Sequence, residues 1–304
     1  MTEPTNGGSA ESIRHRLRNV LRERGEDVSL GLQRYASERF LYRLGRSVHR
    51  ERFVLKGATL FAIWGTTYRP TRDLDFTAYG DPDVEAVLGA LREICITPDD
   101  VDALRFEADT IRTEPIRDGS EYPGIRVHII ALLGTSRMPI QLDLGFGNAI
   151  VPGPEEVEYR TLLGDPPPHI RAYPQESVVA EKLHAMVTLG LQNSRYKDFY
   201  DMHTMATAFR FDRSTLVAAV RATFERRATP VADETPAALR ATFYADAARA
   251  MQWRAYVARS GMTGVSQDFA AIGERIGAFL QPVWDDLRVD GEVRGAWSFD
   301  GGWR

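Results

Sequence analysis

LKGATLFAIWGTTYRPTRDLDF, residues 55–76, is the stretch that decides the fold of this chain. Near its end, Asp73 and Asp75 are separated and followed by apolar residues. In a β-strand, this period places both carboxylates on one face and the apolar side chains on the other. Two carboxylates side by side repel each other unless a cation lies between them, and such pairs suit a Mg²⁺ ion that also holds substrate phosphates. The alternative is an edge strand with a solvated polar face.

The same stretch begins with a turn of small residues, Gly57-Ala58-Thr59, and an apolar run that predicts a short helix over 57–64. Glycine permits unusual backbone angles and the close approach of a ligand. The first turn of a helix offers free N–H groups and the positive end of the helix dipole to a phosphate. Thr59 could add a hydroxyl and Lys56 a charge. The two acids follow this turn about sixteen residues later in the sequence, and this spacing strengthens the prediction of a site for metal and phosphate.

The whole chain has 304 residues, 43% of them hydrophobic, and a net charge of −4. This composition predicts one or two folded domains and no general nucleic-acid-binding coat, and no apolar run reaches the roughly 18 residues of a membrane span. The polar residues 1–11 predict a disordered tail and no signal peptide. Cys95 is the only cysteine. It excludes an internal disulfide and a cysteine zinc cluster, fits a cytoplasmic protein and is expected in the core.

Lysine is rare: only Lys56, Lys182 and Lys197 occur among 38 lysines and arginines. Arginine-rich usage is typical of a GC-rich genome. All three lysines nevertheless fall in segments that carry other signals, as expected of sites that need a compact point charge for phosphate.

Helices and strands are interleaved in the front half of the chain. Helices are expected over 12–24, over 30–47 with Ser29 as N-cap, and over 82–94 after Asp81. Strands are expected over 73–77, 105–116, 125–133 and 138–146, the last two joined by a four-residue turn, 134–137. This order predicts an α+β domain around a mixed sheet over residues 12–165.

The back half differs. Residues 164–177 hold four prolines and predict a linker or crossover loop. Helical spacing follows over 178–189, 216–228, 236–260 and 267–287, with 295–304 loosely ordered. Phe243, Trp253, Tyr256, Phe279 and Trp284 are expected in its core. We expect a helical domain over 166–304 that contributes to the active site, in a cleft between the two halves.

A third acid follows on the strand that ends in QLDLGF. Asp143 shares its polar face with Gln141, while the alternate residues are apolar. Asp143 is either a satisfied polar residue on an exposed face or the third carboxylate of a site. Three acids could hold two Mg²⁺ ions about 4 Å apart, with Asp143 as general base.

A second charged cluster lies in the back half, over 176–202. Glu181 and Lys182 lie on one predicted helix; Arg195, Lys197, Asp198 and Asp201 follow a polar loop, the two acids on one face of the next helix. The cluster is either a charged helix surface with internal ion pairs or a site for a triphosphate. His184 and His203 lack partners at metal spacing, so they are expected to pack or form hydrogen bonds, and zinc is not expected.

Gly57-Ala58 followed by Asp73-Leu74-Asp75 resembles the signature of the DNA-polymerase-beta-like nucleotidyltransferase superfamily. The chain is more specifically similar, over about residues 30–285, to AbiEii/AbiGii-type nucleotidyltransferase toxins. Three pieces carry this second resemblance: LKGATLFAIW, RPTRDLDF from Arg69 to Phe76, and AEKLHAM with NSRYKDFYD. Ala58 stands where that family often has Gly or Ser, which removes a hydroxyl and leaves the backbone site.

The resemblance implies roles for these residues. Asp73 and Asp75 would bind metal, Lys182 would contact the triphosphate and Asp198 would be an essential acid; Asp143 fits the superfamily's third catalytic and metal-binding acid. The NTP-binding set comprises Lys56, Gly57, Ala58, Thr59, Arg72, Lys182, Arg195, Lys197 and Asp201. The implied activity is Mg²⁺- or Mn²⁺-dependent transfer of NMP from an NTP to an RNA 3′ end. The expected acceptor is the acceptor end of tRNA, and the transfer would block translation.

The same resemblance implies a toxin–antitoxin or phage-defence system with an antitoxin encoded nearby. The antitoxin would bind directly or modify the toxin, for example at Thr71, where a phosphate would add negative charge beside Asp73. Arginine stripes at 14, 18 and 22 and at 221, 226 and 227 could bind RNA phosphates or could be solvated helix faces. The alternatives are a protein or small-molecule acceptor, or a GTP-binding regulatory module without turnover.

Overall fold

The computed structural model describes residues 9–66, 71–99, 102–116, 124–260, 262, 264–289, 291 and 293–304. The chain divides into two compact units. The sheet unit comprises the chain up to Trp64, Thr71–Gly147 and Glu155–Ala172, and the helical unit comprises Gly65–Pro70, Asn148–Pro154 and Tyr173–Arg304. No helix in the described part of the chain has the length and apolar character needed to cross a membrane.

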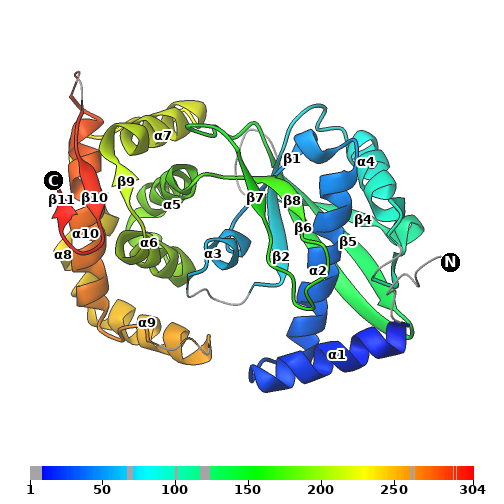
Figure 1. Ribbon diagram of the computed structural model, residues 1–304. Coiled ribbons are helices and arrows are strands. Elements are labelled where there is room, and N and C mark those ends of the chain that lie inside the picture. The colour runs from blue at the N-terminus through cyan, green and yellow to red at the C-terminus, as the bar shows by residue number, and fades with distance from the viewer. Residues whose placement is uncertain are drawn as a thin grey trace. The chain divides into compact units, whose positions relative to one another are not determined.

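The sheet unit is built on a mixed sheet of eight described strands in the order β3-β5-β6-β2-β1-β8-β7, with β4 also paired to β5 (Figure 1). The strands are β1 Phe53–Lys56, β2 Asp73–Ala78, β3 Leu104–Phe106, β4 Arg112–Ile116, β5 Gly124–Leu133, β6 Ser136–Phe146, β7 Glu155–Glu158 and β8 His169–Ala172. β2 pairs with β6, and β1 with β8, in parallel, while the other pairs are antiparallel. The expected α+β class with a mixed sheet is therefore confirmed.

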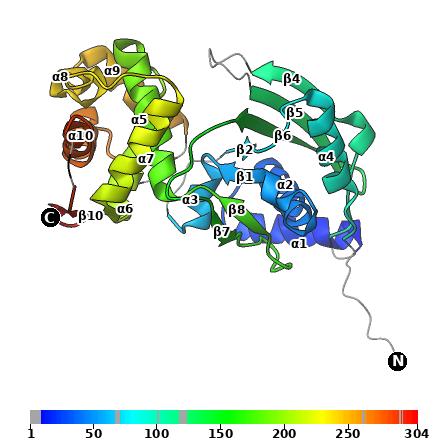
Figure 2. The ribbon, with the colours of Figure 1, turned by 90° about the horizontal axis from the view of Figure 1, so that it is seen from above.

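The apolar sides of the helices in this unit contribute to its core. The helices are α1 Ala10–Glu23, α2 Val28–Arg46, α3 Thr59–Ile63 and α4 Val84–Ile96, with 3-10 turns η1 Arg50–Arg52 and η2 Ala108–Thr110. α2 and α4 lie on the same side of the sheet (Figure 2). Phe40 of α2 and Leu91 of α4 line one apolar core with Phe76 and Leu142 of the sheet. By strand alternation, the acids of β2 and β6 lie on the opposite face.

The helix starts differ in detail from the sequence predictions because other side chains provide the caps. Asp27, not Ser29, caps α2, and its carboxylate accepts a hydrogen bond from Leu30 N at 2.9 Å. Asp83, not Asp81, caps α4. α1 begins at Ala10, inside the expected tail; residues 1–8 of that tail lie outside the described residues.

The β5–β6 hairpin corrects the expected turn. Leu133 pairs with Ser136, so the connection has two residues, Gly134 and Thr135, and not four. Gly134 has a φ of +60°, and a two-residue type II′ turn needs glycine at this first central position. The shorter turn fixes which side chains stand opposite each other along both strands.

Two more predictions about strands needed correction. The expected strand over 105–116 is two short strands, β3 and β4, separated by η2. The proline-rich segment, expected to be a linker, contains β8, which pairs with β1 and β7. Strands β1, β7 and β8 have four residues each. Such lengths are too short for alternation to identify them from sequence.

The helical unit consists of helices and a small terminal sheet. Its elements are α5 Gln175–Leu189, η3 Gly190–Gln192, α6 Tyr196–Ala208, β9 Phe211–Asp212, α7 Arg213–Arg226, η4 Ala237–Leu239, α8 Ala241–Tyr244, α9 Ala247–Arg259, α10 Phe269–Asp286, β10 Ala296–Ser298 and β11 Gly302–Trp303. The continuous helix expected over 236–260 is thus broken into three pieces.

Aromatic side chains form the core of the helical unit, as predicted. Phe243, Trp253, Phe279 and Trp284 are at most 2% exposed, and Tyr256 is half-buried against Trp253. The C-terminal segment is not loosely ordered: Trp297 of β10 is 1% exposed, packs on Phe279 and donates a hydrogen bond to Ala206 O. In the sheet unit, Cys95 is buried as predicted, and burial raises the pKa of its thiol to about 12.

Candidate active site

Strand β2 carries the two acids in the middle of the sheet. Asp73 and Asp75 are half-buried, while Leu74 and Phe76 between and after them are buried. Asp75 stands opposite Lys56 on β1 and opposite Asp143 on β6. The structure therefore brings three of the predicted residues into one row across neighbouring strands.

Gly57 gives the Asp75 carboxylate its space. Its φ is +76°, in the left-handed region that favours glycine. A Cβ built on Gly57 would lie 2.0 Å from Oδ2 of Asp75, so no other residue fits without moving that carboxylate. We expected Gly57 to let a ligand approach the backbone closely. In the structure, the group that approaches it is the carboxylate of Asp75.

The start of α3 is short, and the phosphate-binding role expected of Gly57, Ala58 and Thr59 stays a prediction. The helix has only five residues, too few to build a strong dipole. The N–H groups of Leu60 and Phe61 already donate to Gly57 O and Ala58 O, at 3.3 and 3.2 Å. Thr59 is 7% exposed and Ala58 is buried, so the Thr59 side chain has little access to a ligand.

The residues just before β2 are partly described. Arg69 and Pro70, which begin one of the sequence motifs, lie outside the described residues. Arg72 is exposed next to the acids. Thr71 is half-buried and its hydroxyl donates to the backbone oxygen of Asp73 at 3.4 Å.

Asp143 has a partner that sequence reasoning missed. Nε and Nη2 of Arg126 donate to the two carboxylate oxygens of Asp143, each at 2.8 Å. Gln141 Nε2 adds a third hydrogen bond, at 3.1 Å. The hydrogen bonds to Asp143 raise the pKa of Arg126 above its ordinary value, so its charge is fixed.

The hairpin register could have revealed this pair. Alternation in IRVHIIALL puts Arg126 on the polar face of β5. The two-residue turn then places it opposite Asp143, whereas the four-residue turn expected from sequence would have placed Gly145 there.

The sheet unit offers hard oxygen donors for a divalent cation on the polar face of β2. Among the described residues, no three Asp, Glu, His or Cys side chains converge as a metal site would require. Both oxygens of Asp143 face Arg126, so its expected role as a third metal ligand stays a prediction. Asp73 and Asp75 remain as a pair of hard oxygen donors on one face, which fits a Mg²⁺ ion that takes its other ligands from phosphates and water.

The helical unit holds the second cluster, centred on Lys182. Its Nζ donates to Asp198 Oδ1 at 3.2 Å and to Asp201 Oδ2 at 2.7 Å, so one lysine of α5 joins two acids of α6. The lysine side chain is 13% exposed and the carboxylates 2% and 1%. In this structure the cluster is an internal ion-pair network and not a solvated helix face.

Further cations surround Asp198. Arg195 Nε lies 2.8 Å from Asp198 Oδ2, an ion-pair distance, although its N–H is not aligned for a hydrogen bond. Burial alone would raise the pKa of Asp198, but the charges of Lys182 and Arg195 outweigh it and lower the pKa. Arg195 and Lys197 are exposed at the start of α6. Asp198 is thus an ionised carboxylate held next to exposed cations.

The comparison with protein families decides the assignment. Residues 39–275 match the family described as nucleotidyl transferase AbiEii toxin, type IV toxin–antitoxin system. The chain belongs to this family. The match includes the acids of β2, Asp143 and the whole Lys182 cluster.

Two solved structures are similar to this AbiEii-family protein at low identity. One is a candidate nucleotidyltransferase from H. pylori, with 14% identity, a TM-score of 0.44 and coverage of 84% of this chain and 94% of that one. The other is JHP933 from Helicobacter pylori, with 12% identity, a TM-score of 0.46 and coverage of 92% and 95%. A search of the curated proteins gives no match.

The opposite face of α5 in this AbiEii-family protein carries a separate polar network. Glu181 accepts a hydrogen bond from Tyr173 at 3.0 Å and lies 3.6 Å from Arg227. His184 is hydrogen-bonded to Thr229 at 2.8 Å, and burial, then Arg227, lowers its pKa to about 4. His184 is therefore a neutral hydrogen-bonding residue, as predicted, and the exposed Arg227 contacts both His184 and Glu181 of α5.

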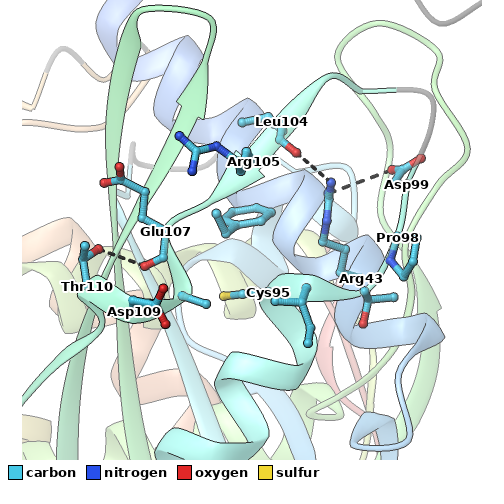
Figure 3. A pocket seen from close by; sticks show the side chains of 13 residues that line it. Arg43, Cys95, Pro98, Asp99, Leu104, Arg105, Glu107, Asp109 and Thr110 are labelled. Atoms are coloured by element: carbon cyan, nitrogen blue, oxygen red, sulfur yellow. Dashed lines mark hydrogen bonds and ion pairs between the residues drawn. The ribbon is translucent and has the colours of Figure 1, made fainter.

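A pocket of about 510 Å³ also lies in the sheet unit (Figure 3). Arg43, Cys95, Asp99, Arg105, Glu107 and Asp109 are among its lining residues. None of the predicted site residues lines it, and Arg43 in its wall donates to Leu104 O and to Asp102. This part of the pocket wall is therefore formed by Arg43 of α2, whose ion pair with Asp102 is a structural contact.

Proposed function

We propose that this AbiEii-family protein transfers a nucleoside monophosphate from an NTP to the 3′-hydroxyl of an RNA, with the acceptor end of tRNA as its target. Adding a nucleotide there would block aminoacylation and so translation. The observation that carries the proposal is the row on the polar face of the sheet, where Asp75 stands between Lys56 and Asp143 and Gly57 leaves room for its carboxylate.

Asp73 and Asp75 would hold a divalent cation, Mg²⁺ or Mn²⁺, together with the phosphates of the NTP. The cation would supply charge stabilisation to the phosphates as the leaving pyrophosphate forms. In the transfer, the 3′-oxygen forms a bond to the α-phosphorus, the bond to the β-phosphate oxygen breaks and the hydroxyl proton passes to solvent. Asp143 is a weak candidate for general base because both of its carboxylate oxygens already accept hydrogen bonds from Arg126.

Lys182 and Asp198 would serve the same reaction. The family resemblance gives Lys182 to the triphosphate, and its ammonium would then exchange a carboxylate of α6 for phosphate oxygens. Exposed Arg195 and Lys197 would add positive charge for the NTP, while Asp198 keeps the lysine in place. We further propose that a separately encoded antitoxin restrains the enzyme, as expected for the type IV family.

The test is a labelling experiment with each α-³²P-NTP and total RNA. Wild type should label RNA of tRNA size with a preferred NTP, and Asp75→Asn should lose the label by at least about 100-fold. Asp109→Asn, an exposed acid of the same unit, is the matched control and should label normally.

The fate of the label separates the rival functions. Label on protein or on a small solute, with RNA unlabelled, would replace the RNA acceptor by a protein or small-molecule hydroxyl. Nucleotide binding without pyrophosphate release would identify a binding module and overturn the proposed enzyme.

A further inference from the structure

The polar face of the sheet carries a continuous row of charges. Cross-strand register places Glu114 of β4, Arg126 of β5, Asp143 of β6, Asp75 of β2 and Lys56 of β1 side by side. The row therefore has a fixed cation, Arg126, next to the acid that would be the third carboxylate of a two-metal site. Directly opposite residues on neighbouring strands are close enough to interact strongly.

Arg126 is positioned from both sides. Its guanidinium forms the two-point contact with Asp143, and its Nη1 lies 3.7 Å from Glu114 Oε1 on the other side. Gln141 holds the Asp143 carboxylate from along β6. The planar fork of arginine matches a carboxylate in this way, and lysine does not. The contact is therefore specific in geometry as well as in charge.

A second metal ion would have to displace this contact. In a three-acid site the third carboxylate helps to hold two cations, but here both Asp143 oxygens already face the guanidinium. The charge of Arg126 also lies near enough to Asp73 for the two to interact. The guanidinium thus supplies positive charge on the acid face without any metal.

We propose that Arg126 takes the place of a second metal ion, so that the reaction uses one divalent cation, bound by Asp73 and Asp75, and Asp143 serves to position Arg126. This inference rests on the proposed nucleotidyl transfer. It assigns Asp143 as the positioning residue for Arg126, and it removes Asp143 from the set of metal ligands.

The direct test counts Mn²⁺ ions bound to the full chain in the presence of a non-hydrolysable NTP analogue, by electron paramagnetic resonance. We expect about one bound ion for wild type, none with Asp75→Asn, and about one with Asp143→Asn. Arg126→Met should free the Asp143 carboxylate and bind about two ions, with Mn²⁺ affinity tightened on the order of 10-fold by loss of a nearby positive charge.

Control variants distinguish a change in the number of bound Mn²⁺ ions from a loss of folding. Arg105→Met removes an exposed arginine of β3 in the same sheet and should leave the count unchanged. Arg126→Lys keeps the charge without the fork and should keep the count at about one. Circular dichroism would confirm that each variant folds.

Two results would overturn the inference: two ions on wild type that fall to one with Asp143→Asn, or a count that stays at one in folded Arg126→Met. The labelling assay distinguishes failure of the proposed function, because an inactive wild type that still binds one Mn²⁺ would overturn nucleotidyl transfer alone. An active wild type with two ions would overturn only the role of Arg126.

Discussion

Gly57 lies so close to Asp75 that a Cβ built on its α-carbon would stand 2.0 Å from Oδ2 of that carboxylate. The turn before α3 and Asp75 of β2 are therefore in contact, because β1 and β2 are paired neighbours in the sheet. The closeness of this contact predicts how the site responds to one added methyl group.

Gly57→Ala should lose activity far more than stability. The left-handed φ of +76° costs about 1–2 kcal/mol for a residue with a Cβ. The methyl group would also push Asp75 away, for an activity loss on the order of 100-fold. Gly80→Ala is the matched control: its φ is +86°, but the nearest atom to its Cβ is Arg52 Nε at 4.0 Å. If both variants lose equal stability but only Gly57→Ala loses activity, the close contact with Asp75 is supported as the cause. Equal activities of the two variants would contradict it.

Lys182→Met should destabilise the helical unit. It would leave Asp198 and Asp201 buried without the cation that joins them, which costs about 3–5 kcal/mol in similar cases. Urea unfolding would measure the loss. Adding Asp198→Asn and Asp201→Asn should recover much of the stability without recovering labelling of RNA. Lys197→Met, on the exposed side of α6, should unfold like wild type; an equal loss there would argue against the buried network.

Glu38 should make stability depend on pH. Burial raises the pKa of this carboxyl from 4.5 to about 8, although Leu162 N donates to it. Between those pH values the folded chain keeps a proton that the unfolded chain has released. Stability therefore falls as pH rises through this window and levels off above it. Glu38→Gln should flatten the profile of urea midpoint against pH, whereas Glu23→Gln, an exposed substitution, should leave the slope in place. An unchanged slope in folded Glu38→Gln would refute the assignment.

Thr71→Glu should weaken activity by adding negative charge beside the acids. The Thr71 hydroxyl already donates to the backbone oxygen of Asp73, so a carboxylate at this position lies near the proposed cation site. We expect a higher apparent Michaelis constant for the NTP and for Mg²⁺. Thr71→Val, which loses the hydroxyl without adding charge, should be close to wild type. Full activity of Thr71→Glu would rule out control of the enzyme by phosphorylation at this residue.

Much of the fold could be predicted from local patterns. The strand at Asp73, the hairpin strands and the aromatic helical core follow from periods of two and 3.6 residues, which local sequence encodes directly. The short strands β1, β7 and β8 could not be predicted, because each is held by its neighbours in the sheet and not by its own pattern.

The burial of charged side chains also could not be predicted from the sequence. Arg39 and Arg43 are one turn apart on α2, a spacing that suggests a solvated stripe, yet they are 0% and 3% exposed. Both donate to Asp102, at 3.0 and 2.6 Å, on a segment some sixty positions away. Only the packing of α2 over the sheet brings these partners together.

The sequence by itself determined that Asp73 and Asp75 share one face of a strand, because side chains alternate in any β-strand, and it determined the family through motifs that are contiguous in the chain. Only the tertiary structure decided which side chains contact the acids of the two clusters. A two-residue turn, two residues shorter than expected, places Arg126 opposite Asp143, and the packing of α5 on α6 places Lys182 against two carboxylates. The reason is physical: strand register and helix packing are settled by the burial of whole faces, which no local pattern contains.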